Sequence, residues 1–281
     1  MGVWTQLFPP SPHFTEAQTP SLAGKVFIVT GGNSGVGFEL AKILYSKGGN
    51  VYIASRSATR IATAIADIKA QGHEMHMGTN CYGPYLLTKL LLPLLTATAQ
   101  SEPKHSVRIV FTSSGIIDMA GPAAGLALAD LEPGNHATDM NYNYSSSKAG
   151  NWFLAAEFDR RYGGDGIVAV AQSPGTLRTP GWDGTPWLLR ALMKPVFREP
   201  RMGAYTQLWA GLGADVQSGD GGRFGIPWGR WNETPRKEHL ASLRGRGEGG
   251  TGLAGEFFEY CERVTGGFVG GGTEECTRAG F

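Results

Sequence analysis

A tyrosine and a lysine lie four residues apart in the stretch 141–151, at Tyr144 and Lys148. Residues four apart share one face of a helix, so the phenol and the ammonium would be neighbours. A nearby ammonium stabilises a phenolate and lowers the pKa of the phenol, and such a tyrosine can donate or accept a proton. Tyr142 has no lysine four residues later, which makes it the weaker candidate. Such pairs also occur by chance, but this one predicts acid–base chemistry at Tyr144.

A serine closes an apolar run that has the character of a buried strand. The run is 106–114, and Ser114 is its last residue. A hydroxyl at the end of a strand can bind a substrate carbonyl, whereas the alternative for Ser113 and Ser114 is an ordinary turn. Ser114 is therefore the candidate partner of Tyr144.

A glycine-rich turn follows the first apolar run, 24–32. Gly31 allows a tight turn, Gly35 lets backbone N–H groups approach a pyrophosphate, and Gly37 lets the next helix pack closely. The N-terminus of that helix would face the phosphate charge. Because the glycines lie between a strand and a helix, the turn predicts dinucleotide binding rather than a loop without a ligand. The residues assigned to this site are Thr30, Gly31, Asn33, Ser34, Gly35, Val36 and Gly37.

The end of the second strand, 50–56, bears on which dinucleotide binds. An Asp or Glu at this place holds the ribose 2′-hydroxyl of NAD. The chain has Arg56 instead, and a guanidinium suits a 2′-phosphate. The alternative is a solvated arginine that opens a helix. The sequence thus favours NADP over NAD.

Strands alternate with helices along most of the chain, which predicts one α/β domain with a parallel, doubly wound Rossmann-type sheet and helices on both faces. The alternation fails once, because no strand separates two consecutive helices, 57–70 and 74–97. The predicted strands are 24–32, 50–56, 106–114 and 166–175, and the other predicted helices are 34–47, 143–161, 203–212 and 252–264.

Composition excludes several classes of protein. The net charge of +1 and the pI of about 7.7 give no sign of a nucleic-acid or anionic-membrane partner. Three cysteines suit a reducing compartment, and the apolar stretch 84–95 is too short to span a membrane, so we expect a cytoplasmic protein. Residues 1–21 should form an N-terminal arm and 265–281 a flexible tail. His73 and His76 lack a third ligand, which indicates a surface turn rather than a metal site.

The glycine turn, the strand-closing serine and the Tyr-x-x-x-Lys pair together resemble the short-chain dehydrogenase/reductase family. The stretch 173–179, SPGTLRT, is similar to the family's Pro-Gly turn beside the nicotinamide. Arg56 and the stretch 78–95 look most like its retinol-dehydrogenase-like reductases of fungal type. The resemblance covers roughly residues 22–230. It implies hydride transfer between NADP and a carbonyl or secondary alcohol.

The resemblance also implies roles for individual residues. Tyr144 would be the general acid/base, and Lys148 would lower its pKa and bind the ribose. Ser114 would orient the substrate carbonyl, and Asn80 would anchor a proton-relay water. Further cofactor contacts would come from Pro174, Gly175, Thr176 and Thr179. Segment 176–202 would be a lid over a fairly apolar substrate, shaped by Trp182, Trp187, Leu188 and Met193. A homodimer is compatible with the sequence.

The family's sheet has seven strands in the order 3-2-1-4-5-6-7, and here the third strand, its helix and the fourth strand have no counterpart. At about 30 residues for each β-α-β unit, roughly 60 residues are absent. Orphaning about five backbone groups on the first strand would cost roughly 5–15 kcal/mol, which equals the stability of a domain. We therefore expect strand 106–114 to pair with strand 24–30. An active reductase, a catalytically inactive truncated relative that keeps at most nucleotide or partner binding, and a scaffold protein using 176–202 all remain open.

Overall fold

The computed structural model describes residues 2–54, 73–178, 187, 191 and 193–268. Within this part of the chain, the strands are β1 (Val26–Thr30), β2 (Asn50–Ala54), β3 (Val107–Thr112), β4 (Ile167–Gln172), β5 (Phe224–Ile226) and β6 (Arg230–Trp231). The predictions for Arg56, the helix 57–70, Thr179, Trp182 and Leu188 lie outside the described residues.

The predicted helices are present, with ends that differ by a few residues. They are α2 (Gly35–Ser46), α5 (Gly83–Ser101), α6 (Met140–Tyr162), α8 (Pro200–Leu212) and α10 (Leu253–Thr265). The predicted helix 74–97 begins as a short α4 (Met75–Met77) and a π-helical turn, η1 (Gly78–Tyr82), before α5. Elements that the sequence did not predict are α1 (Gly2–Leu7), α9 (Lys237–Leu243), β5, β6 and the 3₁₀ turns η2 (Gly115–Asp118) and η3 (Leu128–Leu131).

The strands form two separate sheets. Among the described residues, β1 pairs with β2 alone, in parallel, and the second sheet has the order β3-β4-β5-β6. The α/β architecture with helices on both sides is as predicted, but the predicted pairing of strand 106–114 with strand 24–30 is wrong. The physical reason is that helix packing through α8 joins the two halves without strand pairing, and two side chains bind the Thr112 carbonyl at the edge of β3.

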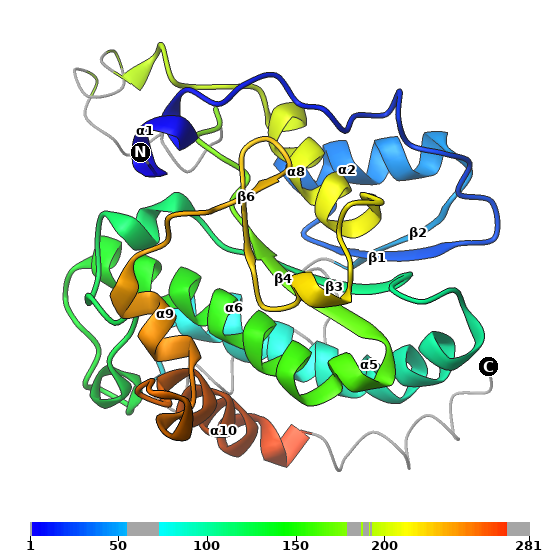
Figure 1. Cartoon of the computed structure of the whole chain (residues 1–281). Coiled ribbons are helices and arrows are strands. Elements are labelled where there is room, and N and C mark those ends of the chain that lie inside the picture. Colours follow the sequence, from blue (N-terminus) through cyan, green and yellow to red (C-terminus); the bar gives the residue numbers. More distant parts are fainter. Residues whose placement is uncertain (1, 55–72, 179–186, 188–190, 192, 269–281) are drawn as a thin grey trace.

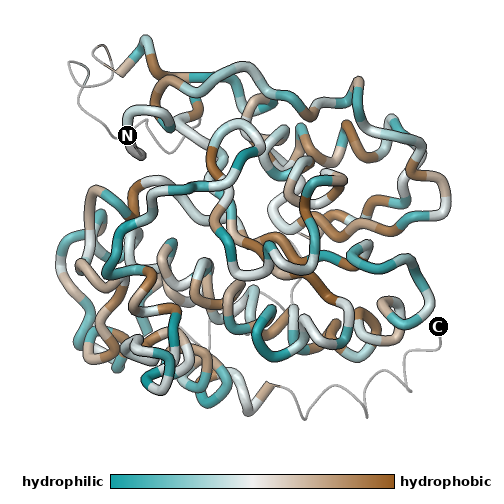
Figure 2. Tube along the Cα trace, viewed as in Figure 1, coloured by the Kyte–Doolittle hydropathy of each residue, from teal (hydrophilic) through white to brown (hydrophobic). Residues whose placement is uncertain are grey.

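The four-stranded half contains the main core. Alternate residues of β4 point to opposite faces: Val168 and Val170 pack with Trp209 of α8, whereas Ala169 and Ala171 face the cluster formed by α5, α6 and α10. Figure 1 shows α8 on one side of this sheet and α5 and α6 on the other. Figure 2 shows the hydrophobic residues concentrated along these central strands.

The two-stranded half is attached through helix packing rather than through a shared sheet. Ile43 and Leu44 of α2 form one buried cluster with Ala204 and Leu208 of α8, and Val29 of β1 joins it. α8 in turn packs on β3, β4 and β5. α8 therefore packs both on α2 of the two-stranded half and on the strands of the four-stranded sheet.

An arginine on β3 strengthens this joint. The Arg108 guanidinium donates hydrogen bonds to the carbonyl oxygens of Ala210 at 3.2 Å, Gly213 at 3.0 Å and Val216 at 2.8 Å. These carbonyls lie at and just after the C-terminal end of α8, where a helix leaves carbonyls without partners and favours a cation. Arg108 thus fixes the end of α8 to β3.

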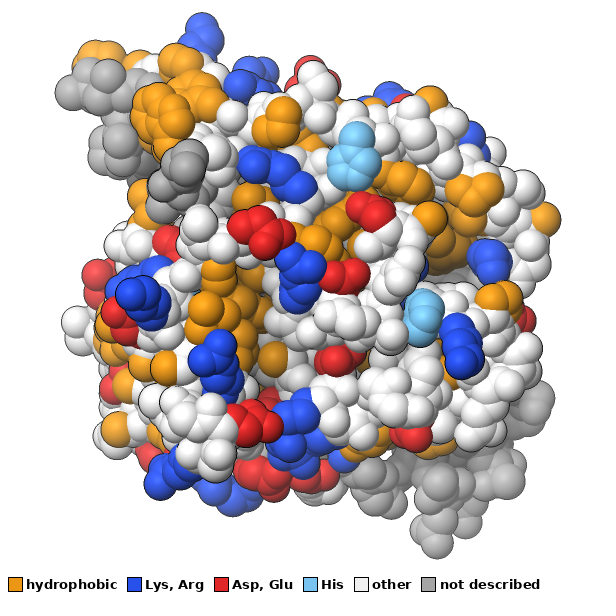
Figure 3. Space-filling view, viewed as in Figure 1, with side chains coloured by type: hydrophobic (Ala, Val, Ile, Leu, Met, Phe, Trp, Pro, Cys, Tyr) orange, Lys and Arg blue, Asp and Glu red, His pale blue; other side chains and the backbone are white. Residues whose placement is uncertain are grey.

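The other face of β1 and β2 is open. Val26 is 61%, Ile28 is 45% and Tyr52 is 65% exposed, and all three side chains lie on the face away from α2. Figure 3 shows hydrophobic side chains at the surface over the region of α2, β1 and β2, on the upper right. Apolar side chains of this size are normally buried in a parallel sheet.

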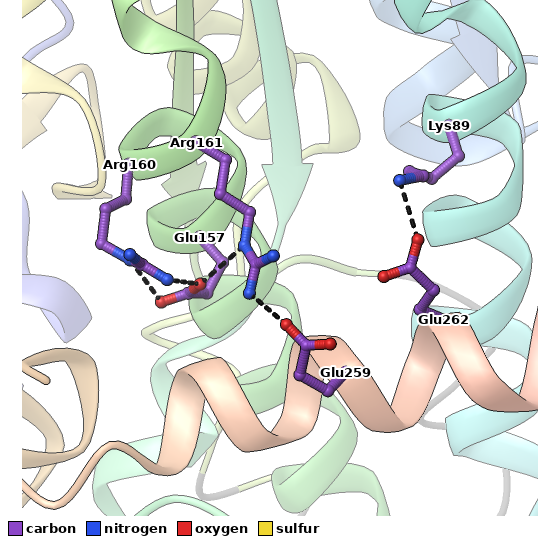
Figure 4. A network of polar contacts seen from close by, with 6 residues as sticks. All are labelled: Lys89, Glu157, Arg160, Arg161, Glu259 and Glu262. Carbon is purple, nitrogen blue, oxygen red and sulfur yellow. Dashed lines mark hydrogen bonds and ion pairs between the residues drawn. The ribbon is translucent and has the colours of Figure 1, made fainter.

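The last helix closes the opposite side of the molecule. α10 packs on α6 and α5, and two ion pairs connect them: Arg161 with Glu259 at 2.6 Å, and Lys89 with Glu262 at 3.0 Å. Figure 4 shows these pairs together with Glu157, which is buried and paired with Arg161 as well. No helix among the described residues is long and apolar enough to cross a membrane.

Candidate active site

The tyrosine and lysine of the predicted pair lie on one face of α6. Asp139 caps this helix by accepting hydrogen bonds from the backbone N–H groups of Asn141 and Tyr142, which fixes where the first turn begins. The Lys148 Nζ lies 5.5 Å from the centre of the Tyr144 ring. The expected neighbourhood of phenol and ammonium is therefore present.

Ser114 lies two residues after the end of β3 and beside Tyr144. Burial raises the pKa of Tyr144, and a hydrogen bond from Ser114 opposes this by stabilising the phenolate. Burial is the larger effect, so the phenol stays protonated at neutral pH. Ser114 also accepts a hydrogen bond from the backbone N–H of Ile116, at 3.3 Å.

Lys148 is engaged with the free edge of the four-stranded sheet. Its Nζ donates to the Thr112 carbonyl at 3.1 Å, and the Asn151 amide donates to the same oxygen at 2.9 Å. Burial lowers the pKa of Lys148 to about 8. The two influences that shift the pKa of Tyr144 are burial and Ser114, whereas the Lys148 ammonium faces Thr112.

Asn80 reaches the same face of α6 from the π-helical turn. Its amide donates to the Ser147 Oγ at 2.9 Å, and Ser147 donates to the Tyr144 carbonyl at 2.8 Å. Cys81 is buried and donates to the Ser147 carbonyl at 3.1 Å, so it packs between the helices. The structure thus brings together the four residues expected to act in catalysis, Ser114, Tyr144, Lys148 and Asn80.

Tyr142 is held by a different partner. Its hydroxyl donates to the Asp130 carboxylate at 2.9 Å. Burial and this carboxylate raise the pKa of Tyr142 to about 12, because both disfavour the phenolate. This explains in physical terms why Tyr142 is the weaker candidate.

The glycine turn has the backbone shape that the sequence implies. Gly31 has a φ of 68° and Gly35 a φ of 55°, which favour glycine. A Cβ on Gly37 would lie 2.6 Å from the Gly31 carbonyl oxygen, so only glycine fits there. Ser34 makes no side-chain hydrogen bond to the N-terminus of α2, which leaves those N–H groups available to a ligand. The residues of the turn fit a pyrophosphate, and Thr30, Asn33 and Ser34 are exposed, with Val36 half-buried.

The Pro-Gly turn follows β4, whose end lies beside the end of β3. Gly175 has a φ of 82°, and a Cβ there would lie 2.9 Å from Pro227. Thr176 accepts a backbone hydrogen bond from Arg198 at 3.0 Å, which closes the base of the predicted lid. Pro174 is half-buried at this turn. Of the predicted lid residues, Trp187 is exposed and Met193 is half-buried.

The structure adds a histidine that sequence reasoning assigned to a surface turn. His76 lies on α4, and its ring packs edge-on against the Tyr144 ring with centroids 5.7 Å apart. His73 contacts Tyr82 and Tyr260 instead. The surface-turn interpretation is therefore wrong for His76, which lies in a helix and packs on Tyr144. The signal was the spacing, since His76 precedes Asn80 by four residues on one continuous helical run.

A cavity of about 430 Å³ lies away from these residues, near the end of α10. It has an open mouth, and none of the candidate catalytic residues contributes to its wall. Its lining residues are His73, Glu132, Pro133, Tyr260, Arg263, Val264, Gly267 and Phe268.

Comparison with known proteins decides the family. The family model for the short chain dehydrogenase matches residues 25–78. A short-chain dehydrogenase/reductase of Pestalotiopsis fici is 38% identical over 93% of this chain and 96% of its own length, and one of Neocamarosporium betae is 33% identical over 95% and 94%. The chain belongs to the short-chain dehydrogenase/reductase family. The predicted family and its general class, oxidoreductases, are confirmed.

Solved structures agree on the fold. A protein of Mycobacterium paratuberculosis superposes with a TM-score of 0.59 at 22% identity and covers 90% of this chain and 97% of its own. A 3-ketoacyl-(acyl-carrier-protein) reductase from Brucella melitensis, complexed with NADH, superposes with a TM-score of 0.51 at 17% identity and covers 73% and 97%. At these identities the likeness concerns the fold alone.

The alignment lengths also measure what this chain lacks. The alignment with the Pestalotiopsis relative has 321 positions, but 93% of 281 residues is only about 261 residues. In total, about 60 positions of that relative therefore have no counterpart here. This agrees with the roughly 60 residues that the sequence predicts to be absent, at about 30 for each β-α-β unit.

Proposed function

We propose that this member of the short-chain dehydrogenase/reductase family transfers a hydride between NADP and a carbonyl or secondary alcohol of a fairly apolar small molecule. The observation that supports the proposal most directly is the convergence of Ser114, Tyr144 and Asn80 at the N-terminal part of α6. A bound nicotinamide supplies the hydride. The protein supplies a proton donor and an oriented carbonyl.

In this reaction, Tyr144 and Ser114 would act on the substrate oxygen, and two turns would hold the cofactor. Tyr144 gives its proton to the substrate oxygen, because its raised pKa keeps it protonated at neutral pH. Ser114 donates a hydrogen bond to the same oxygen and, after transfer, to the phenolate. The turn at Gly31–Gly37 would hold the pyrophosphate through backbone N–H groups. Pro174, Gly175 and Thr176 would border the nicotinamide.

The preference for NADP over NAD is the most specific part of the proposal and the simplest to test. Arg56 and the absence of an acidic residue at the end of the second strand support NADP over NAD. Titration with NADPH and NADH, followed by fluorescence, should give tighter binding of NADPH. Arg56→Asp should reverse the order. An unchanged ratio in that variant would remove Arg56 from the cofactor site.

A second candidate function is a catalytically inactive relative that retains at most nucleotide or partner binding. The division into two sheets favours it, because the glycine turn belongs to one half and Tyr144 to the other. NADPH binding without turnover supports this second function. Binding with turnover that Tyr144→Phe abolishes supports the first.

A further inference from the structure

The carboxylate of Glu74, the imidazole of His76 and the phenol of Tyr144 lie next to one another, where the start of the helical run 74–101 packs on α6. The Glu74 Oε1 lies 2.6 Å from the His76 Nδ1, and the His76 ring meets the Tyr144 ring edge-on with centroids 5.7 Å apart. The side chain of His76 is 19% exposed, so the imidazole connects a half-buried phenol with solvent.

Glu74 is fixed at both oxygens. Its Oε2 accepts a hydrogen bond from the Met77 backbone N–H at 2.9 Å, which caps α4, and its Oε1 faces His76. A carboxylate held in this way keeps the proton of the imidazole on Nδ1 and leaves Nε2 for exchange. A base that is itself oriented by a third group is the usual arrangement for activating a hydroxyl.

The groups that the family resemblance assigns to proton transfer are already engaged. Lys148 donates to the Thr112 carbonyl, and Asn80 donates to the Ser147 hydroxyl. Tyr144 carries a phenol whose pKa burial raises, and it needs a partner that exchanges protons near neutral pH. Histidine is the side chain suited to that exchange.

We propose that His76, oriented by Glu74, exchanges the proton of Tyr144 with solvent, directly or through one bound water. The proposal rests on the proposed role of Tyr144 and adds a route that the resemblance does not supply. His76 is a positioning and proton-transfer partner that acts through Tyr144 and does not contact the substrate.

The proton balance is simple. When Tyr144 protonates the substrate oxygen it becomes a phenolate. The His76 imidazolium then gives its Nε2 proton to the phenolate oxygen and becomes neutral, and water returns a proton to Nε2. The Nδ1 proton stays between His76 and Glu74 throughout. For oxidation of an alcohol, each step runs in reverse.

Other titratable groups lie near Glu74, His76 and Tyr144, and they contribute to the pH dependence of the proposed proton exchange. Asp130 and His136 face Glu74 across a void of about 10 Å³, which has room for one water at most. Cys81 is a buried thiol, and the Lys148 Nζ lies 5.5 Å from the centre of the Tyr144 ring.

The decisive test needs no turnover. In ¹⁵N-histidine spectra of the full chain, His76 is identified by the signal lost in His76→Gln, with His73→Gln as the matched control. We expect the Nδ1–H form of neutral His76. In Tyr144→Phe the ¹⁵N chemical shift of the His76 Nε2 should change, because the hydroxyl that exchanges a proton with Nε2 is absent.

Two results would overturn the proposal: a neutral His76 with its proton on Nε2, or an Nε2 chemical shift that stays unchanged in Tyr144→Phe. A histidine that only packs within α4, without proton exchange with Tyr144, would give the second result. If His76→Gln fails to fold in a thermal melt, Glu74→Gln provides the identification, because it should change the tautomer of one histidine only. If Tyr144→Phe changes the His76 signal but the protein transfers no hydride, the proposed function is refuted. The proposed proton exchange between His76 and Tyr144 would still hold.

Discussion

β4 and β1 are both short, apolar, parallel strands, yet they differ in how far their side chains are buried. All six residues of β4 are buried, whereas only Val29 is buried in β1. β4 has a strand on each side and helices on both faces, but β1 has one strand beside it and one covered face. The burial of a strand therefore depends on its neighbours more than on its own residues. The glycine turn is built on the poorly supported half, and Tyr144 on the well-supported one.

The largest effect should come from breaking the joint between the halves. Arg108→Met leaves the carbonyls of Ala210 and Val216 without their donor, at about 1–3 kcal/mol each, whereas the Gly213 carbonyl keeps the Val216 N–H. We expect the free energy of unfolding to fall by about 2–6 kcal/mol. In urea, the single transition should also split into two. Lys104→Met, at an exposed site nearby, is the control. A loss below 1 kcal/mol would mean that α8 holds the halves without Arg108.

Turnover should reveal how well the halves are aligned. They share helix packing but no hydrogen-bonded ladder, and a misplacement of 1 Å can cost about 100-fold in rate. We expect NADPH oxidation with apolar ketones and aldehydes to be about 100-fold slower than in a full-length relative, after a cooperative melt has confirmed folding. Equal rates would show that α8 alone aligns the site.

The same substitution can be made in both strands. Ile167→Thr in β4 buries a hydroxyl where the native side chain is 1% exposed, and it should cost about 2 kcal/mol. Ile28→Thr in β1 alters a side chain that is 45% exposed, so the change should stay within about 0.5 kcal/mol. Urea unfolding of both variants measures the contrast. Equal losses would contradict the difference in burial.

The last effect concerns pH and acts on the four-stranded half. Lys148 has its pKa lowered to about 8, so between pH 8 and 10.5 the unfolded chain binds a proton that the folded chain has released. The free energy of unfolding should therefore rise with pH in this window, by up to about 1.4 kcal/mol per pH unit. Lys148→Met should remove that part of the slope. Lys25→Met, exposed in the two-stranded half, should leave it intact.

Local patterns were sufficient to predict β1 to β4 and the Tyr144–Lys148 face. Continuous apolar runs and the four-residue spacing depend on nearby residues only. β5 and β6 have three and two residues and lie in a glycine-rich stretch, so no periodic signal identifies them. They exist because β4 offers a free edge, which no local window contains.

The misjudged parts depended on distant contacts. The expected closure of β1 on β3 came from counting lost backbone partners, but it could not foresee that Lys148 and Asn151 would bind the Thr112 carbonyl. His76 was misread for a similar reason. Its role follows from the packing of α4 against α6, and only the spacing to Asn80 hints at it.

The free edges of β1 and β3 also determine how this chain could be rebuilt. Restoring the residues that its relatives possess would require the separation of no existing strand pair, because neither edge is hydrogen-bonded to the other. Among the described residues, the contacts of Lys148 and Asn151 with the Thr112 carbonyl would have to break. Inserting the corresponding block of a relative ahead of His73 would thus add strands without separating existing ones. Lys148, released from the Thr112 carbonyl, would become available to a ligand at the same time.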